Sequence, residues 1–315
     1  MCHMRRIVSF VIVTKNNRAT ITFTLASIKQ FAKAYTTELI IVDGMSNDGT
    51  YDMIKDFALR NYKQFYKVKI IKDPGTSLSY ARNVGFEQSS GDIVIFLDGD
   101  MLLHPSFAKN FKLSIINDYD LLAPNISVMK LDYYTELFDV LLDVVNAYSF
   151  LLNKPDIVPQ ARIFTREALE KLHGYPRLSK YFGEDRLTTA LAISIGLRYA
   201  YLPSLSIIKI DEPSFKAYIK KHIRYGSGII DDLSNFGKCL LRGYILTRRL
   251  TYLNLVLPVI SALYAFTALK ILKNKRMREV LSIFAFKYVI DLSMLVGEIK
   301  ALLRKLRQKL KYIAA

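Results

Sequence analysis

Two aspartates at the end of an apolar run are well placed for metal chemistry. Residues 91–105 read GDIVIFLDGDMLLHP, so an apolar stretch runs directly into Asp98, Gly99 and Asp100. Such a run predicts a buried strand, which would put both carboxylates at the edge of a sheet. Mg²⁺ and Mn²⁺ prefer hard oxygen ligands and keep positions open for phosphate oxygens. The pattern predicts a divalent metal site that would neutralise a diphosphate leaving group, with Gly99 letting the backbone approach the ligand closely.

An Asp-x-Asp triplet also occurs by chance, and an ordinary turn is the alternative interpretation. A second one, Asp118-Tyr119-Asp120, precedes the apolar residues LLAP instead of following a strand. We interpret that second triplet as a solvated turn. The first triplet, Asp98-Gly99-Asp100, follows a predicted strand, and this placement favours a metal site there.

Alternating strands and helices must position these carboxylates. Short apolar, β-branched runs predict strands over 7–14, 38–43, 67–73 and 92–98, and helical periodicity predicts helices over 18–34, 50–61 and 77–89. This alternation predicts an α/β fold, Rossmann-like, with a mostly parallel sheet flanked by helices. Ligands bind beyond the carboxyl ends of such strands, where Thr14, Asn16, Asp43 and Asp98 all fall.

A second carboxylate pair opens a later helix. The pattern predicts a long apolar helix over 133–153, a short strand and helix over 159–176, a helix over 183–196 and a strand over 198–210. Glu184 and Asp185 lie at the start of the predicted helix over 183–196. They fit two roles: acids favour the first turn of a helix, and a carboxylate near an acceptor hydroxyl can serve as general base.

Four motifs together resemble those of family 2 glycosyltransferases, which have the GT-A fold. In chain order they are VSFVIVTKNNR, ELIIVDGMSNDGT, ARNVGFEQSSGDIVIFLDGD and GEDRLTTALAISIG, and the resemblance covers roughly residues 6–210. It implies an inverting transferase that takes a sugar from a nucleoside-diphosphate sugar and depends on Mg²⁺ or Mn²⁺.

The resemblance implies roles for individual residues. Asp100 matches the metal ligand and Asp98 the residue near the ribose and the metal. Asp185 matches the catalytic base, with Glu184 as its neighbour. The remaining matches lie near the nucleotide: Thr14, Asn16, Asp43, which would read the base, Arg82 and Asn83. Uracil and guanine both offer an N–H that Asp43 could read. Gly44 departs from the pattern, because the family often has a second Asp there, so the choice between these bases stays open.

The segment KKHIRYGSG, residues 220–228, resembles a basic, aromatic and glycine-containing segment of membrane-associated members. Arg224 could reach the diphosphate of the donor. His222 is a further candidate metal ligand, although a histidine in a basic helix is more often an interface residue.

Charge and apolar content predict membrane association of the C-terminal third. The chain has a net charge of +17, and residues 213–315 hold 20 basic but only 5 acidic residues. Residues 253–272 are long enough to span a bilayer, residues 280–299 are a second span or an amphipathic interfacial helix, and the basic end suits anionic headgroups. A buried helical hairpin in a soluble protein is the alternative. We expect a catalytic domain over 1–212, amphipathic interface helices over 213–250 and a membrane-associated hairpin with a basic tail over 251–315.

These features predict a membrane-associated enzyme. Its partners would be a UDP- or GDP-linked sugar, an anionic membrane surface and a membrane acceptor, either polyprenyl phosphate or a lipid-linked or cell-surface glycan. Nucleic acid is not expected, because the basic residues alternate with long apolar runs. We expect the protein to be located at the cell membrane, with its catalytic domain on the cytoplasmic side. The two cysteines are far apart in the sequence, which agrees with a reducing compartment.

Three alternatives stay open at this point. The tail could be only an anchor for a transferase with a soluble acceptor. The chain could be an inactive membrane scaffold of the same fold. A sugar-1-phosphate nucleotidyltransferase would share the sheet, but a glycine-rich phosphate loop does not follow the first strand.

Overall fold

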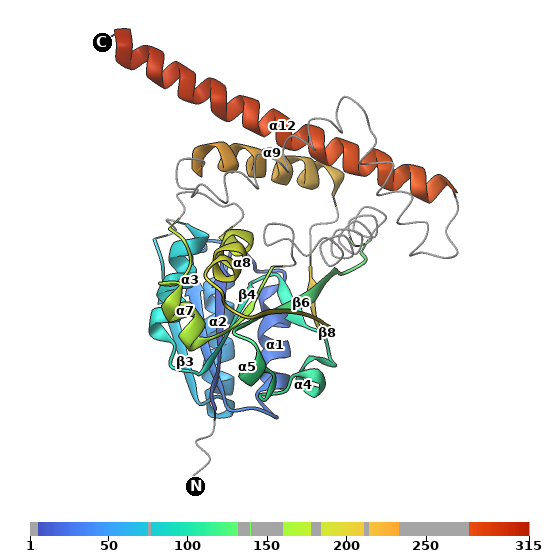
Figure 1. Ribbon diagram of the computed structural model, residues 1–315. Helices are drawn as coiled ribbons and strands as arrows, with labels where there is room; N and C mark the ends of the chain where they lie inside the picture. The colour runs from blue at the N-terminus through green and yellow to red at the C-terminus, as the bar shows by residue number, and fades with distance from the viewer. Residues whose placement is uncertain are drawn as a thin grey trace. The chain divides into compact units, whose positions relative to one another are not determined.

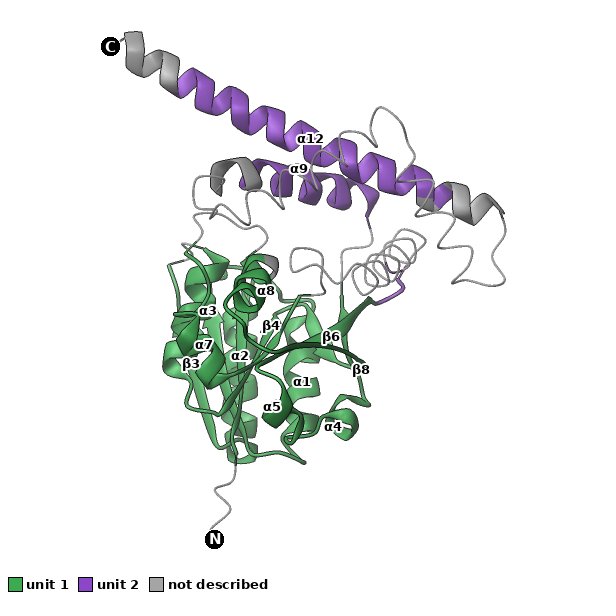
Figure 2. Ribbon diagram, in the orientation of Figure 1, with its two compact units in different colours: residues 1–128, 152–178, 184–211 green, residues 129–151, 179–183, 212–315 purple. Residues whose placement is uncertain are grey.

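The protein forms two compact units in a computed structural model (Figure 2). The first comprises residues 1–128, 152–178 and 184–211, and the second comprises residues 129–151, 179–183 and 212–315. The structure describes residues 6–74, 77–131, 139, 160–177, 184–210, 214–232 and 277–314. The predicted helix over 133–153, except residue 139, and the candidate span over 253–272 lie outside the described residues. The domain boundaries at 212 and 250 stay predictions.

The first unit is built on one eight-stranded sheet with the order β3-β2-β1-β4-β7-β6-β8-β5. Four parallel strands form one half, namely β1 (Val8–Thr14), β2 (Thr37–Asp43), β3 (Lys67–Lys72) and β4 (Ile93–Asp98). The other half contains β5 (Met101–Leu103), β6 (Leu121–Val128), β7 (Ile163–Thr165) and β8 (Tyr199–Lys209).

The sheet is mixed, so the expectation of a mostly parallel sheet holds only for its first half. β7 is antiparallel to both β4 and β6, and β5 is antiparallel to β8. β6 and β8 are parallel to each other. Strands β5 and β6 were not expected from the sequence, because β5 is three residues long and β6 begins next to the triplet that we interpreted as a turn.

Helices cover both faces of the sheet (Figure 1). Alternate residues of β1 point to opposite faces, as the strand period of two requires. Phe10 and Ile12 pack with α1, whereas Val11 shares a cluster with residues of α7 and α8. The helices of this unit are α1 (Ile21–Phe31), α2 (Thr50–Asn61), η1 (Tyr62–Gln64), α3 (Leu78–Gln88), α4 (Phe107–Asn110), α5 (Ile115–Asp118), α7 (Arg166–Lys171) and α8 (Glu184–Ser194).

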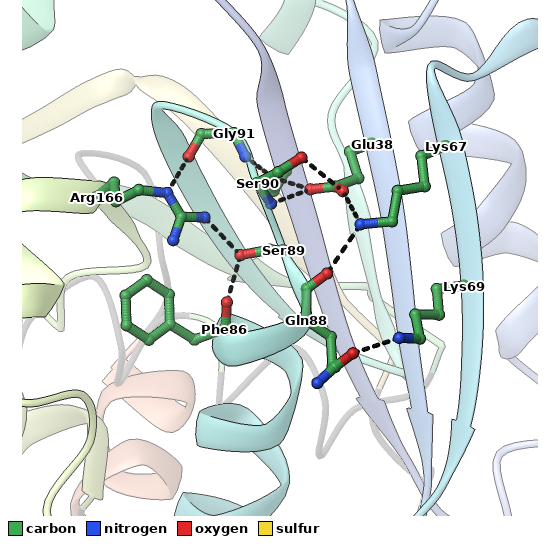
Figure 3. A network of polar contacts seen from close by, with 10 residues as sticks. Glu38, Lys67, Lys69, Phe86, Gln88, Ser89, Ser90, Gly91 and Arg166 are labelled. Atoms are coloured by element: carbon green, nitrogen blue, oxygen red, sulfur yellow. Dashed lines mark hydrogen bonds and ion pairs between the residues drawn. The ribbon is translucent and has the colours of Figure 1, made fainter.

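A buried carboxylate joins the amino-terminal parts of the central strands (Figure 3). Glu38 is fully buried, and it accepts hydrogen bonds from the Ser9 hydroxyl (2.5 Å), the Ser90 amide (2.7 Å) and the Lys67 ammonium (2.8 Å). Burial opposes ionisation of Glu38, but the hydrogen bonds from Lys67, Ser9 and Ser90 hold its pKa below the usual value. A buried charge of this kind is tolerated only because several donors satisfy it.

The second unit contains two described helices, α9 (Phe215–Asp232) and α12 (Met277–Ala314). The two helices pack closely at Gly226 of α9 and Gly297 of α12, where no side chain separates the backbones. A Cβ at Gly226 would lie 1.9 Å from the Met294 carbonyl oxygen, and one at Gly297 would lie 1.9 Å from the Ile223 carbonyl oxygen. Within α12, Lys287 and Asp291 are four residues apart and form an ion pair.

A helix that crosses a bilayer must be both long and predominantly apolar. In the part of the chain that the structure describes, none of the helices combines these two properties. This result includes residues 280–299, which form part of α12, so they do not meet the requirement for a second span.

Candidate active site

The carboxyl ends of three parallel strands carry the polar residues that the sequence singled out. In the sheet Thr14 is level with Asp43, and Val13 is level with Asp98. The predicted site residues at these strand ends therefore lie along one edge of the sheet. This is the edge at which open α/β sheets bind ligands.

The loop after β1 is held against the loop after β2. Asn16 has a left-handed backbone (φ 54°), which asparagine tolerates better than most residues. Its amide donates to the Ser46 hydroxyl (2.9 Å), and its side-chain oxygen accepts from the Asn47 amide (3.0 Å). Ser46 in turn donates its amide and its hydroxyl to the two oxygens of Asp43, at 2.9 and 2.6 Å. These bonds fix the orientation of the buried Asp43 carboxylate, which retains further acceptor capacity for a nucleobase N–H.

Gly99 is required by a close approach within the protein. A Cβ there would lie 2.3 Å from the Thr14 hydroxyl oxygen and 2.9 Å from the Asn17 side-chain oxygen. The Gly99 carbonyl accepts hydrogen bonds from the hydroxyls of Thr20 (2.8 Å) and Thr24 (3.1 Å). These contacts anchor the turn between Asp98 and Asp100 to α1 and to the loop before it, and the close approach of this backbone to a ligand stays a prediction.

Behind this edge lies a buried network of charges, which we call the arginine–carboxylate cluster. Its members are Arg82, Arg162, Asp98, Glu184 and Asp185. Arg82 bonds Glu184 (2.5 Å) and Asp98 (2.8 Å) and lies 3.5 Å from Asp185. Arg162 bonds Asp185 (2.8 Å) and lies 3.5 Å from Asp98. The cluster brings together the predicted base, its neighbour and the first aspartate of the metal motif.

Two members of this region were missed in the sequence. Arg162 is 3% exposed and comes from the short segment before β7. Tyr175 is also buried, and the Arg82 guanidinium carbon lies 5.3 Å from the centre of its ring, a cation–π distance. Among the described residues none is a hydrogen-bond partner of the buried Tyr175 hydroxyl. An arginine within the apolar segment QARIF was the available signal, because an unpaired arginine is costly in such surroundings.

Asn83 holds Tyr175 in place. Its side-chain oxygen accepts from the Tyr175 amide (2.7 Å), and its side-chain nitrogen donates to the Tyr175 carbonyl (2.9 Å). Both ends of the Asn83 amide are therefore engaged by protein backbone. Its nucleotide-binding role stays a prediction, and its contacts here are structural.

The cluster separates the pKa values of two aspartates. Burial raises the pKa of Asp185 to about 6, against the opposing effect of Arg162 and Arg82, and the charges of Glu184 and Asp98 act in the same direction as burial. For Asp98 burial has the same sign, but Arg162 and Arg82 outweigh it and hold its pKa well below the usual value. Asp98 is therefore a fixed anion, whereas Asp185 exchanges its proton close to neutral pH, as a general base requires.

Asp100 is the better candidate metal ligand of the two aspartates in the DGD motif. Both oxygens of Asp98 face guanidinium groups. Asp100 lies 3.5 Å from the Lys209 ammonium, with its side chain 24% exposed. Among the described residues no group of three or more His, Cys, Asp and Glu side chains could hold a metal. A single, partly exposed carboxylate still fits Mg²⁺ or Mn²⁺, since these ions take water and diphosphate oxygens as further ligands.

The remaining predicted site residues lie on α9 in the second unit. The Nδ1 atom of His222 is 2.8 Å from the Tyr218 carbonyl oxygen. A carbonyl only accepts, so Nδ1 carries the proton. Arg224 is exposed, and its guanidinium carbon is 6.0 Å from the ring centre of Tyr225. The roles of His222 as a metal ligand and of Arg224 at the diphosphate stay predictions.

The second Asp-x-Asp triplet is not simply a solvated turn. Asp120 accepts hydrogen bonds from the Arg198 amide (2.8 Å) and from its guanidinium group (3.1 Å). These bonds join the start of β6 to the start of β8, and they lower the pKa of Asp120. Asp120 therefore has a structural role, and the exposed Asp56 on α2 is the better control for substitutions in the metal motif.

Sequence comparisons agree with the motifs. The profile of Glycosyl transferase family 2 matches residues 9–173, more than half of the chain. A 100-residue segment is 37% identical to the poly(ribitol-phosphate) beta-N-acetylglucosaminyltransferase TarP of Staphylococcus aureus and covers 31% of this chain and 29% of that protein. A 101-residue segment is 31% identical to the dolichol-phosphate mannosyltransferase of Pyrococcus furiosus, with 31% and 26% covered. The matched segments span less than a third of these two relatives.

Solved structures share the fold over most of the chain. The mannosyltransferase PcManGT from Pyrobaculum calidifontis, in complex with GDP-Man and Mn²⁺, superposes with a TM-score of 0.63 at 18% identity and covers 95% of this chain and 88% of that one. The first 349 residues of S. aureus TarS, in complex with UDP, give a TM-score of 0.54 at 16% identity, with 93% and 91% covered. These matches confirm a GT-A-like α/β fold with a mixed sheet flanked by helices. By its sequence profile, the chain belongs to glycosyl transferase family 2.

Proposed function

We propose that the protein is an inverting glycosyltransferase that moves a sugar from a UDP- or GDP-linked donor to a membrane-associated acceptor. The observation that carries the proposal is Asp185. It is buried against Arg162, its pKa is raised to about 6, and it shares the arginine–carboxylate cluster with Asp98 at the ligand-binding edge of the sheet. A strongly perturbed carboxylate at such an edge is typical of catalytic sites.

The donor side is supported by the strand ends. Asp43 and Thr14 are side by side at the edge of the sheet, in the position expected for a nucleoside. Structural neighbours have been solved with GDP-Man and with UDP, which is the basis for proposing these two nucleotides. A divalent ion held by Asp100 would neutralise charge on the departing diphosphate.

Asp185 is the proposed general base. It accepts the proton of an acceptor hydroxyl while the hydroxyl oxygen forms a bond to the anomeric carbon, on the side opposite the departing diphosphate. The configuration at that carbon is thereby inverted, and the proton rests on a carboxylate oxygen of Asp185. Arg162 and Arg82 hold this carboxylate in place, and they limit the rise of its pKa so that it is largely ionised at neutral pH.

The acceptor and the location are proposed from the C-terminal charge. Residues 213–315 are strongly basic, which favours an anionic membrane surface and a polyprenyl phosphate or lipid-linked glycan acceptor on the cytoplasmic side. A soluble acceptor or an inactive scaffold remain the alternatives. The full chain should appear in the membrane fraction of expressing cells, and recovery in the soluble fraction without detergent would contradict membrane association.

A donor panel tests the activity. The purified full chain should release nucleoside diphosphate from a UDP- or GDP-linked sugar when Mn²⁺ or Mg²⁺ is present, and EDTA should stop the release. Donors that bind without being consumed, with every acceptor class offered, would favour the inactive scaffold.

A further inference from the structure

A pocket between the two helices of the second unit is lined mainly by cations. Lys220 and Arg224 come from α9, and Lys300 and Arg304 come from α12. Ile223, Ser227 and Gly228 complete the lining on the α9 side, and the volume is about 410 Å³. We call this the basic pocket. It lies within one compact unit, so its geometry does not depend on how the two units are arranged.

Close helix packing creates the pocket. At Gly226 and Gly297 the backbones of α9 and α12 approach without intervening side chains. Small residues at a helix crossing bring neighbouring side chains of both helices together. The pairs 220/224 and 300/304 each have i,i+4 spacing, so each pair lies on one face of its helix.

The arrangement concentrates like charges around one space. Like charges at i,i+4 destabilise a helix, and here two such pairs converge on one space. Among the described residues that line the basic pocket none is acidic, and all four cations are exposed at its walls. An anion in the basic pocket would reduce the repulsion among these four cations.

From this geometry we propose that the basic pocket binds a phosphate group carried by a larger molecule. Phosphate suits the lining, because guanidinium groups bind its oxygens in pairs and ammonium groups add point charges. Ser227 supplies a hydroxyl donor, and a volume of about 410 Å³ exceeds the size of a single phosphate. This inference goes beyond the proposed transfer reaction and does not rest on it.

The phosphate could come from a lipid headgroup or from a soluble phosphorylated molecule. Leu302, Leu303 and Leu306 on α12 are more than half exposed and lie next to Lys300 and Arg304 in the chain. An apolar surface beside a phosphate site is compatible with a lipid. The experiment therefore needs one arm for each source.

Binding of inorganic pyrophosphate to the full chain tests the site. Calorimetry is done with EDTA present, so that a metal-dependent donor site does not contribute. The double variant Lys300→Gln/Arg304→Gln should bind at least about tenfold more weakly than the wild type, since hydrogen bonds to charged groups contribute this much. The matched control, Lys305→Gln/Arg307→Gln, removes the same charge from the same helix outside the pocket, and it should change binding less than about twofold.

Folding and charge are checked separately. The exchange Lys300→Arg/Arg304→Lys should restore binding, and helix content by circular dichroism should match the wild type. Equal losses in the pocket and control variants would show that the helix is only a basic surface, and the proposal would be wrong. Absence of pyrophosphate binding by the wild type at millimolar concentration would also overturn it.

Vesicles distinguish the two sources. The site is assigned to a lipid headgroup if the wild type binds phosphatidylglycerol vesicles but not phosphatidylcholine vesicles. In that case the pocket variant should lose this binding, and pyrophosphate should displace the vesicles from the wild type. Pyrophosphate binding with unchanged vesicle binding in the pocket variant assigns it to a soluble phosphate. Both readouts are independent of sugar transfer, so failure of the proposed enzyme function would leave this test intact.

Discussion

Replacing Asp185 by asparagine should make the stability of the protein less sensitive to pH. The pKa of this buried carboxyl rises from 3.8 to about 6 on folding. The native protein therefore holds a proton between these values, whereas the unfolded chain has already released it. As a result the wild type loses stability as pH rises through this window, and the loss is complete above it.

The size of the effect follows from the shift. Each pKa unit corresponds to 1.36 kcal/mol, and the unfolded carboxyl is already partly ionised at pH 4, so the contribution of Asp185 falls by about 2.4 kcal/mol between pH 4 and pH 8. Asparagine has no such contribution. Its amide also meets Arg162 as a donor instead of an acceptor, but that cost is the same at both pH values and cancels in the comparison.

Urea unfolding of both proteins at pH 4 and pH 8 measures the effect. The stability of Asp185→Asn minus that of the wild type should increase by about 2.4 kcal/mol from the lower to the higher pH. Parallel profiles would refute the reasoning, because they would mean that Asp185 has an ordinary pKa in the native state. A difference of the opposite sign would place the carboxyl among the groups whose pKa is lowered on folding.

Three further changes have defined outcomes. Asp185→Asn should reduce transfer to a hydroxyl acceptor by at least about 100-fold while donor binding is retained, and transfer to an ionised phosphate acceptor much less, as measured by product formation with each acceptor class. Asp100→Asn should lower metal-dependent release of nucleoside diphosphate by about 100-fold or more, whereas Asp56→Asn should not, and equal losses would contradict the metal assignment. Glu38→Ala should lower the free energy of unfolding by about 2–4 kcal/mol, because the buried Ser9 hydroxyl, the Ser90 amide and Lys67 lose their acceptor; Glu87→Ala, at an exposed position, should change it by less than about 0.5 kcal/mol in the same urea titration.

The parallel half of the sheet was predictable because its strands carry their own signal. The apolar runs that became β1, β2 and β4 are long and buried on both faces, so composition and length were sufficient. In the other half the strands that became β7 and β8 were expected, but their pairing was not, because β7 is only three residues long and pairs with β4 across some 70 residues of chain. Such pairing depends on tertiary packing and leaves little trace in local sequence.

The candidate site was predictable to the extent that it lies in motifs. Asp98 and Asp185 were identified in this way, and the structure brings both to the arginine–carboxylate cluster. Arg162 does not belong to any of the recognised motifs. Its importance is seen only from its burial and from its ion pairs with Asp98 and Asp185. Asn83 was assigned to the nucleotide, but its contacts with the Tyr175 backbone appear only once residues 92 positions apart are folded together.

The buried Glu38 has a consequence for strand alignment. In the sheet Glu38 is directly opposite Ser9 on one side and Lys67 on the other, and these are its hydrogen-bond partners. Five residues further along the same strands, Thr14, Asp43 and Lys72 form the corresponding row at the candidate site. Slipping β2 by one residue would separate Glu38 from its donors in an apolar interior and would move Asp43 about 3.3 Å, onto the other face of the sheet. Glu38 therefore favours the one alignment of the strands in which the site can form.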